Sequence, residues 1–407
     1  MSRLGLFDGY GVEIEYMIVD EDSLDVRPVC DDLMEAMAGE PVSELERGAI
    51  AWSNELVLHV LELKTNGPAT ALAGLGEQFR AEVATADEAL GRMGCRLLPG
   101  GVHPWMDPAR ETHLWPHEYN VVYQTFDRIF GCSGHGWSNL QSTHINLPFD
   151  GDREFGRLHA AIRAAIPLIP ALAAASPFLD GVVAPQLDAR LEAYRGNARR
   201  IPEVAGRVVP DPVTTEEEYR DRILQPLYDA LAPHDPDGVL RHEWANARGS
   251  IARFERGAIE IRVLDAQECV SADLAVVSMV VALVRALCEE RWASTRALDA
   301  IPTEPLSELF VEAVRTGGDA SVVHSGYLKA LGWKQSEATA LGLWRFLADR
   351  LAPDGVPGEY ASALETLVGH GCLASRMVRA HKNDDRSIPS IAADLGDCLR
   401  EDRLFGR

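Results

Sequence analysis

The chain has 407 residues, of which 46% are hydrophobic and 25% charged, a composition typical of a water-soluble protein with a large core. It carries 39 Lys and Arg against 62 Asp and Glu, so its formal net charge is -23 at pH 7. This acidic balance argues against a nucleic acid or an anionic membrane surface as a partner.

The start of the chain and its cysteines indicate a cytoplasmic protein. Residues 1–9 lack the apolar core of a signal peptide, and the longest uncharged runs, 164–179 and 274–284, are shorter than a membrane span. The seven cysteines are odd in number and include no Cys-x-x-Cys pair, which is typical of reduced thiols.

The first 150 residues mix predicted strands and helices. Gly94 follows an Ala- and Leu-rich run and is a helix stop, while Pro148 ends an apolar strand. The patterns predict strands at 11–20, 56–63, 95–101 and 141–147, and helices at 31–40, 70–93 and 118–130.

The rest of the chain is mostly helical in pattern. A long apolar helix is expected over 154–175, kinked or split at Pro167 and Pro170. Residues 176–211 are rich in Pro, Gly and Arg and are interpreted as an active-site loop region. The further expectations are a helix over 214–231 capped by Thr215, a strand over 258–264, and helices at 274–296, 305–316, 336–350 and 360–380.

The order of these elements indicates the fold class. Strands and helices alternate without the regular spacing of βαβ units, so we expect an α+β fold with an antiparallel sheet and helices on its outer face. The length allows one large domain or two ordinary ones, and the mostly helical part over 272–407 is expected to cover one side of the sheet.

The strongest chemical signal is Gly-Val-Glu-Ile-Glu-Tyr at the start of the first predicted strand. Side chains alternate along a strand, so Glu13 and Glu15 share the face opposite Ile14 and Tyr16. Two carboxylates that close are costly unless a positive charge lies between them, and a divalent cation would supply it. No phosphate-loop, dinucleotide, zincin or hydrolase-elbow motif competes with this interpretation.

Three further segments carry similar chemistry in strand settings. Oxygen ligands with one imidazole suit Mg²⁺ or Mn²⁺, and several carboxylates around one cavity indicate more than one ion. Taken alone, each pattern also has a structural explanation. The paired glutamates could lie on a solvated strand edge, the histidine could be an ordinary core residue, and Glu-x-Arg could be a surface ion pair. The odd separation of Glu55 and Glu62 requires a bulge, or Glu55 before the strand proper. The segments hold Glu55 and Glu62; His144 and Asn146; and Glu260 and Arg262.

Taken together, these motifs resemble the glutamate–cysteine ligase superfamily, the carboxylate-amine ligases that share a fold with glutamine synthetase. The resemblance runs from about residue 11 to about residue 380 and rests on the order and spacing of the motifs. They are Gly11-Val12-Glu13-Ile14-Glu15, Glu55 and Glu62, Gly101-Val102-His103-Pro104, Thr143-His144-Ile145-Asn146, Ser176-Pro177-Phe178, Ile259-Glu260-Ile261-Arg262-Val263-Leu264-Asp265, and Leu367-Val368-Gly369-His370-Gly371-Cys372 followed by Ala374 and Arg376.

The resemblance implies a curved antiparallel sheet that forms a funnel, with ATP entering at one mouth and the amino acid at the other. It implies that Arg262 contacts the transferred phosphoryl group and that Arg253 contacts nucleotide phosphate. The metal ligands that it implies are Glu13, Glu15, Glu55, Glu62, His144 and Glu260, with Mg²⁺ or Mn²⁺ as the ion.

Substrate contacts are expected from Asn146 and from the arginines of the loop region, Arg190, Arg195, Arg199 and Arg200, for which a solvated cluster is an equal alternative. The leading hypothesis is an ATP-dependent ligase that joins glutamate to an amine, most simply cysteine, through an acyl phosphate. A guanidino-kinase-like phosphotransferase and a non-catalytic relative that binds amino acid or nucleotide are the alternatives. The acceptor amine, the acid substrate, the oligomeric state and the residue that deprotonates the amine stay open.

Overall fold

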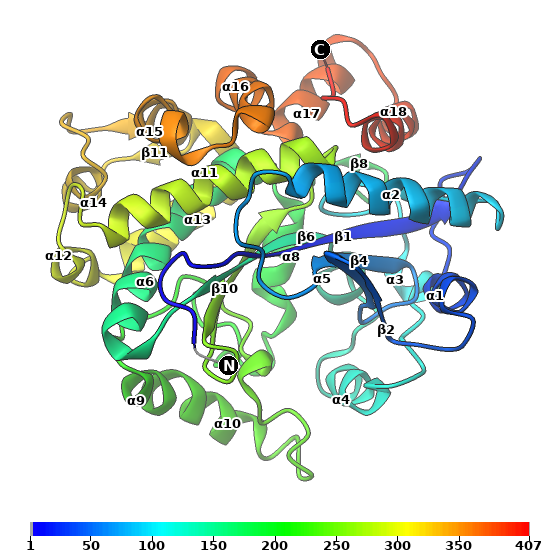
Figure 1. Ribbon diagram of the computed structural model, residues 1–407, viewed down its shortest axis with the longest axis horizontal. Helices are drawn as coiled ribbons and strands as arrows, with labels where there is room; N and C mark the ends of the chain where they lie inside the picture. The colour runs from blue at the N-terminus through cyan, green and yellow to red at the C-terminus, as the bar shows by residue number, and fades with distance from the viewer. Residues whose placement is uncertain (1–2, 407) are drawn as a thin grey trace.

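An antiparallel sheet organises the chain, whose residues 3–406 are described in the computed structural model of Figure 1. The sheet has eight strands in the order β2-β3-β4-β1-β6-β10-β9, with β5 also paired to β1. The expected α+β class with an antiparallel sheet is confirmed. Its strands are β1 (Gly11–Asp20), β2 (Glu44–Arg47), β3 (Ile50–Asn54), β4 (Val60–Thr65), β5 (Cys95–Leu98), β6 (Ser142–Pro148), β9 (Ser250–Arg253) and β10 (Ala258–Asp265); β7 (Phe178–Leu179) pairs with β8 (Val182–Val183), and β11 (Ser321–Val322) with β12 (Ala338–Thr339).

Helices surround the sheet, with α2 and α11 along one side of it and α4, α9 and α10 toward the other in Figure 1. The α-helices are α1 (Cys30–Ala38), α2 (Leu75–Gly91), α3 (Pro108–Glu111), α4 (Asn120–Phe130), α5 (His135–Ser138), α6 (Gly151–Ala165), α7 (Ile169–Ala173), α8 (Ala189–Asn197), α9 (Glu216–Tyr219), α10 (Gln225–Leu231), α11 (Val270–Cys288), α12 (Thr295–Asp299), α13 (Thr303–Thr316), α14 (Ser325–Ala330), α15 (Ala340–Gly355), α16 (Ala361–His370), α17 (Leu373–Asn383) and α18 (Ile388–Glu401). Short helical turns of other types are η1 (Ile166–Leu168), η2 (Arg220–Leu224), η3 (Glu243–Ala245), η4 (Gly317–Asp319) and η5 (Gly358–Tyr360).

The two faces of β1 differ as its alternating pattern predicts. Val12, Ile14, Tyr16 and Ile18 are fully buried in the main hydrophobic core, which also contains residues of α2. Their burial leaves the opposite face of the strand for Glu13 and Glu15. The core therefore fixes which way these carboxylates point.

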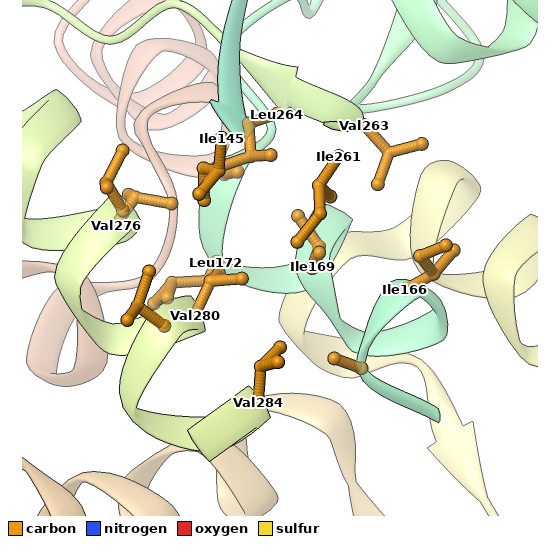
Figure 2. Packing of buried hydrophobic residues seen from close by; sticks show 14 of the residues in the cluster. Ile145, Ile166, Ile169, Leu172, Ile261, Val263, Leu264, Val276, Val280 and Val284 are labelled. Carbon is orange, nitrogen blue, oxygen red and sulfur yellow. The ribbon is translucent and has the colours of Figure 1, made fainter. Parts of the chain in front are cut away.

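The core between sheet and helices is built from branched aliphatic side chains. Figure 2 shows Ile145 of β6 and Ile261 of β10 packed with Leu172 of α7 and Val276 and Val280 of α11. Val and Ile are stiff at χ1 and suit a strand surface, so this layer holds β6 and β10 in a defined register.

The helix α11 has the length and composition of a membrane span. The uncharged run 274–284 within this helix is shorter than such a span. Of the most apolar window of α11, however, 89% is buried inside the protein. Burial on all sides is typical of the central helix of a core.

The structure corrects several expected boundaries. The strand expected at 56–63 begins only at Val60, because the residues before it connect β3 to β4. Helix α8 lies within the expected loop region 176–211, and the strands β2, β3 and β9 were not predicted. The break of the long helix at Pro167 and Pro170 is confirmed, since α6 ends at Ala165 and α7 follows the turn η1.

One buried histidine in the core yields a stability prediction. His159 of α6 is 1% exposed, neither of its ring nitrogens has a hydrogen-bond partner, and it packs beside Phe155 and Tyr219. Burial, with the charge of Arg163, lowers its pKa to about 3. The unfolded chain therefore binds an extra proton between that value and about 6.5, and stability falls as the pH drops through this range.

We expect His159→Leu to raise the melting temperature at pH 7.5, because it removes a buried polar group without a partner. The wild type should lose about 2 kcal/mol between pH 7.5 and pH 5 from this histidine, and the variant should not. Calorimetry at both pH values measures the difference, with the exposed His370→Leu as control. An equal acid loss in wild type and His159→Leu would contradict this.

Candidate active site

Carboxylates of three strands and an imidazole of a fourth line up across one face of the sheet. In the strand register Glu13 of β1 lies opposite Lys64 of β4 on one side and His144 of β6 on the other. Glu15 lies opposite Glu62 of β4. Directly opposed residues of antiparallel strands bring their side chains together, so strand pairing alone assembles these groups in neighbouring rows.

Hydrogen bonds fix the orientation of the two glutamates of β1. Glu13 accepts from the amide of Asn146 at 3.0 Å, and its other oxygen lies 3.1 Å from Nδ1 of His144. Glu15 accepts from both the backbone N–H and the hydroxyl of Ser142, at 2.7 and 3.0 Å. The Ser142 hydroxyl also lies 2.9 Å from Nε2 of His144. The same strand β6 therefore holds both carboxylates.

Two overlapping sets of donor atoms result, with His144 common to both. In each set the donor atoms lie within 4.8 Å of one another. Carboxylates with a single imidazole suit Mg²⁺ or Mn²⁺, and two adjacent sets suit two ions. The sets are Glu13, His144 and Glu260, and Glu15, Glu62 and His144.

Electrostatics in this cluster favour a bound cation. Burial and repulsion from Glu13 raise the pKa of Glu62 to about 7, and burial with the charges of Glu15 and Glu62 raises the pKa of Glu55 well above its usual value. Burial also opposes the charged form of Glu13, but the hydrogen bond and charge of His144 outweigh it and lower its pKa to about 2. A divalent ion would relieve the repulsion among these carboxylates.

Glu55 joins the cluster from the connection between β3 and β4. Glu55 follows the last residue of β3 and precedes β4, so the alternation of side chains along β4 does not determine its direction. This is one of the two arrangements that the odd separation of Glu55 and Glu62 allows. The charge of Glu55 acts on Glu13, Glu15 and Glu62, which places it in their neighbourhood, although it belongs to neither set of donor atoms.

Two arginines approach the cluster at Glu260. Arg262 Nε lies 2.9 Å from one oxygen of Glu260, without hydrogen-bond geometry, and Arg253 Nη1 donates to the other oxygen at 3.4 Å. The Arg262 side chain keeps 25% of its surface exposed. Both arginines can therefore face an anion bound beside the carboxylates, since a guanidinium has more donors than Glu260 uses.

The other expected substrate contacts lie elsewhere or are already engaged. Asn146 donates to Glu13, Arg195 pairs with Glu192 within α8, and Arg199 is exposed and donates to the carbonyl of Gly196. Within residues 3–406 no contact joins Arg195 or Arg199 to the carboxylates. Their substrate roles stay predictions. Arg190 lies on α8, is 2% exposed and pairs with Asp265, which corrects both the loop expected over 176–211 and the alternative of a solvated arginine cluster at this residue.

Sequence reasoning missed Lys64 and Ser142. Lys64 Nζ lies 3.6 Å from Glu62 and 3.3 Å from Glu44, and it is the cross-strand neighbour of Glu13. The signal was present, because each residue lies two positions from a predicted ligand and therefore on the same strand face.

Comparison with known proteins shows the family to which the chain belongs. The model of glutamate-cysteine ligase family 2 matches residues 10–387. The chain belongs to this family. An uncharacterised protein of Archaeoglobus fulgidus is 36% identical to this chain over 97% of this chain and 99% of its own length. A putative glutamate–cysteine ligase 2 of Jannaschia is 25% identical over 70% of this chain and 68% of its own.

The fold of this family 2 member also matches a solved structure. The glutamate–cysteine ligase of Francisella tularensis, in complex with AMP, superposes with a TM-score of 0.59 over 98% of this chain and 90% of that one, at 12% identity. At this identity the match concerns the fold. It agrees with the sheet architecture implied by the sequence motifs.

Proposed function

We propose that the chain is an ATP-dependent carbon–nitrogen ligase that joins the side-chain carboxylate of glutamate to an amine, with cysteine as the simplest acceptor. The observation that carries this proposal is the convergence of carboxylates from β1, β4 and β10 on His144, next to two arginines. Membership of glutamate-cysteine ligase family 2 supports the reaction class, and the AMP bound by the Francisella enzyme supports an adenine nucleotide as substrate.

The reaction needs activation of the acid before the bond to nitrogen forms. A carboxylate oxygen of glutamate attacks the γ-phosphorus of ATP, the bond to the β-phosphate oxygen breaks, and ADP leaves. The amine nitrogen of the acceptor then attacks the acyl carbon, inorganic phosphate leaves, and the nitrogen loses its proton. The net change is one amide formed and one ATP converted to ADP and phosphate.

The residues of the chain have distinct tasks in this scheme. The metal, Mg²⁺ or Mn²⁺, neutralises the ATP phosphates when bound. The residues that would hold it are Glu13, Glu15, Glu62, His144 and Glu260, with Glu55 close by. Arg262 and Arg253 donate N–H groups to the oxygens of the transferred and neighbouring phosphates. Glu260 lies between both guanidinium groups and orients them. Asn146 and Ser142 orient Glu13 and Glu15.

We further propose that residues 1–407 act as one catalytic unit. The helices after residue 272 would then serve to complete the core behind the sheet, because residues of α11 and α15 belong to the same hydrophobic core as residues of the strands that carry the ligands.

The decisive experiment measures ADP and inorganic phosphate with Mg-ATP, glutamate and a panel of amines that includes cysteine. We expect phosphate release only when acid and amine are both present, together with a product whose mass equals their sum less one water. A matched panel without glutamate, with other amino acids as the acid, tests the identity of the donor. ADP formed together with a stable phosphorylated acceptor would contradict the ligase and favour a phosphotransferase.

Metal affinity should depend on pH through Glu62. Its pKa of about 7 means that the carboxyl is largely protonated at pH 6 and ionised at pH 8, and a metal ligand must be ionised. We expect the affinity for Mn²⁺ to rise with pH across this interval, by up to about tenfold per pH unit for each proton released. Titration followed by Mn²⁺ spectroscopy at pH 6, 7 and 8 measures it. An affinity that does not change with pH would contradict a role for Glu62 as ligand.

A further inference from the structure

The strand β10 contains a bulge at Arg262, the residue to which the proposed function assigns a phosphate contact. Ile261 pairs with Ile145 of β6 and Leu264 pairs with Thr143, so Arg262 and Val263 together lie opposite the single residue His144. A bulge of this kind bends the strand and redirects a side chain, and it leaves local backbone groups without their ladder partners. The direction of the Arg262 side chain therefore depends on what holds the bulge in shape.

Both backbone polar groups of Arg262 have partners outside β6. Its N–H donates to the carbonyl of Gly249, just before β9 begins, at 3.0 Å. Its carbonyl accepts from Nη2 of Arg190 at 3.0 Å. Arg190, a residue of α8, therefore supplies a hydrogen bond to the Arg262 carbonyl from outside the sheet.

Arg190 is itself held rigidly. Arg190 is 2% exposed, and its Nη1 donates to Asp265 Oδ1 at 3.3 Å. Asp265 is the last residue of β10, the strand that also contains Arg262. The other oxygen of Asp265 accepts from the backbone N–H of Ala175 at 2.8 Å and from the Ser176 hydroxyl at 2.7 Å. The Ser176 hydroxyl accepts in turn from the Arg190 backbone N–H at 3.1 Å. The carboxylate of Asp265 and the carbonyl of Arg262 are thus clamped by one guanidinium.

We propose that Arg190 is a positioning residue, whose guanidinium bridges the Asp265 carboxylate and the Arg262 carbonyl and so fixes the bulge that directs the Arg262 side chain toward Glu260. The inference rests on the proposed function, because it assigns Arg190 an effect on the transferred phosphoryl group through Arg262. We assign Arg190 no direct contact with that group, because its Nη1 donates to Asp265 and its Nη2 to the Arg262 carbonyl. The Ser176-Pro177 segment, whose chemistry the mechanism does not otherwise use, belongs to the same clamp.

A double-mutant cycle with Arg190→Met and Arg262→Met tests this. In the wild-type background we expect Arg190→Met to lower kcat for ADP release by about ten- to hundredfold, with KM for ATP much less affected, because the misplaced group acts in the transition state. In the Arg262→Met background the same change should alter kcat by less than about twofold. Arg190→Lys keeps the charge but cannot bridge both acceptors, so it should rescue only in part.

The matched control is Arg163→Met, which removes another fully buried arginine that donates to backbone carbonyls, those of Pro210 and Ile301, away from the site. It should lower the melting temperature without changing kcat of the folded protein. Hydrogen exchange provides a second measurement that needs no turnover, since amides of residues 258–265 should exchange faster in Arg190→Met or Arg190→Lys and be unchanged in Arg163→Met.

The outcomes separate the two levels of the proposal. If Arg262→Met leaves ADP release unchanged, the role proposed for Arg262 is wrong and the inference fails with it. If Arg262→Met lowers ADP release but Arg190→Met has the same effect in both backgrounds, only the inference is overturned. Unchanged exchange over 258–265 in the Arg190 variants would also overturn it.

Discussion

Replacing Glu260 by glutamine should lower the rate of ADP release by about a hundredfold or more. Glu260 approaches His144 Nδ1 at 3.9 Å and is paired with Arg253 and Arg262, so its charge serves both the proposed cation and the two guanidinium groups. A neutral amide has nearly the same shape but cannot ligate a hard cation as well, and its NH₂ group would face an arginine. The side chain is 4% exposed, so water cannot replace the lost charge.

Two measurements make this prediction specific. Mn²⁺ affinity should fall by about tenfold or more in Glu260→Gln, because one ligand of the set is weakened. The control Glu46→Gln removes a glutamate on the exposed edge strand β2 and should leave turnover and Mn²⁺ affinity unchanged. Turnover of Glu260→Gln at the wild-type rate would exclude this residue from the site.

Replacing Arg262 by lysine or methionine should lower kcat far more than it changes KM for glutamate or ATP. An interaction that forms only as charge develops on the transferred phosphoryl group is lost from the transition state and not from the bound substrates. We expect about a hundredfold loss for Arg262→Met. Arg262→Lys should recover only part, since lysine lacks the planar fork that pairs with two oxygens at once.

Steady-state kinetics with each substrate varied in turn separates kcat from KM for these variants. The control Arg315→Met removes an exposed arginine that pairs with Glu312 on α13, and its kinetics should match the wild type. A rise in KM for ATP with unchanged kcat would assign Arg262 to substrate binding instead of to the transfer step.

Much of the candidate site could be predicted because it lies on strands with a clear alternation. Glu13 and Glu15 have core residues on either side of them, so their face follows from β1 alone. The same holds for Glu260 of β10, and His144 of β6 lies between the buried residues Thr143 and Ile145. Periodicity did not predict that these strands are neighbours in the sheet. The resemblance to a family predicted that their residues belong to one site.

The parts that sequence reasoning could not predict depend on non-local contacts. The bulge at Arg262 is invisible in the alternation of 258–264, because it arises from how β10 pairs with β6. Arg190 looks like any arginine of a polar segment until Asp265 is brought to it across the fold. The strand β2 was missed because Glu44–Arg47 is short and polar, and an edge strand needs little apolar surface.

The central place of β1 in the sheet also has a consequence for how the molecule is made. Glu13 can meet Glu260 only after the roughly 250 residues between them have been synthesised, since β6 must pair on both sides before the row is complete. Such long-range pairing folds slowly. A nascent chain that has not reached β10 therefore lacks Glu260 and Arg262, and the proposed site is complete only once β10 has paired with β6.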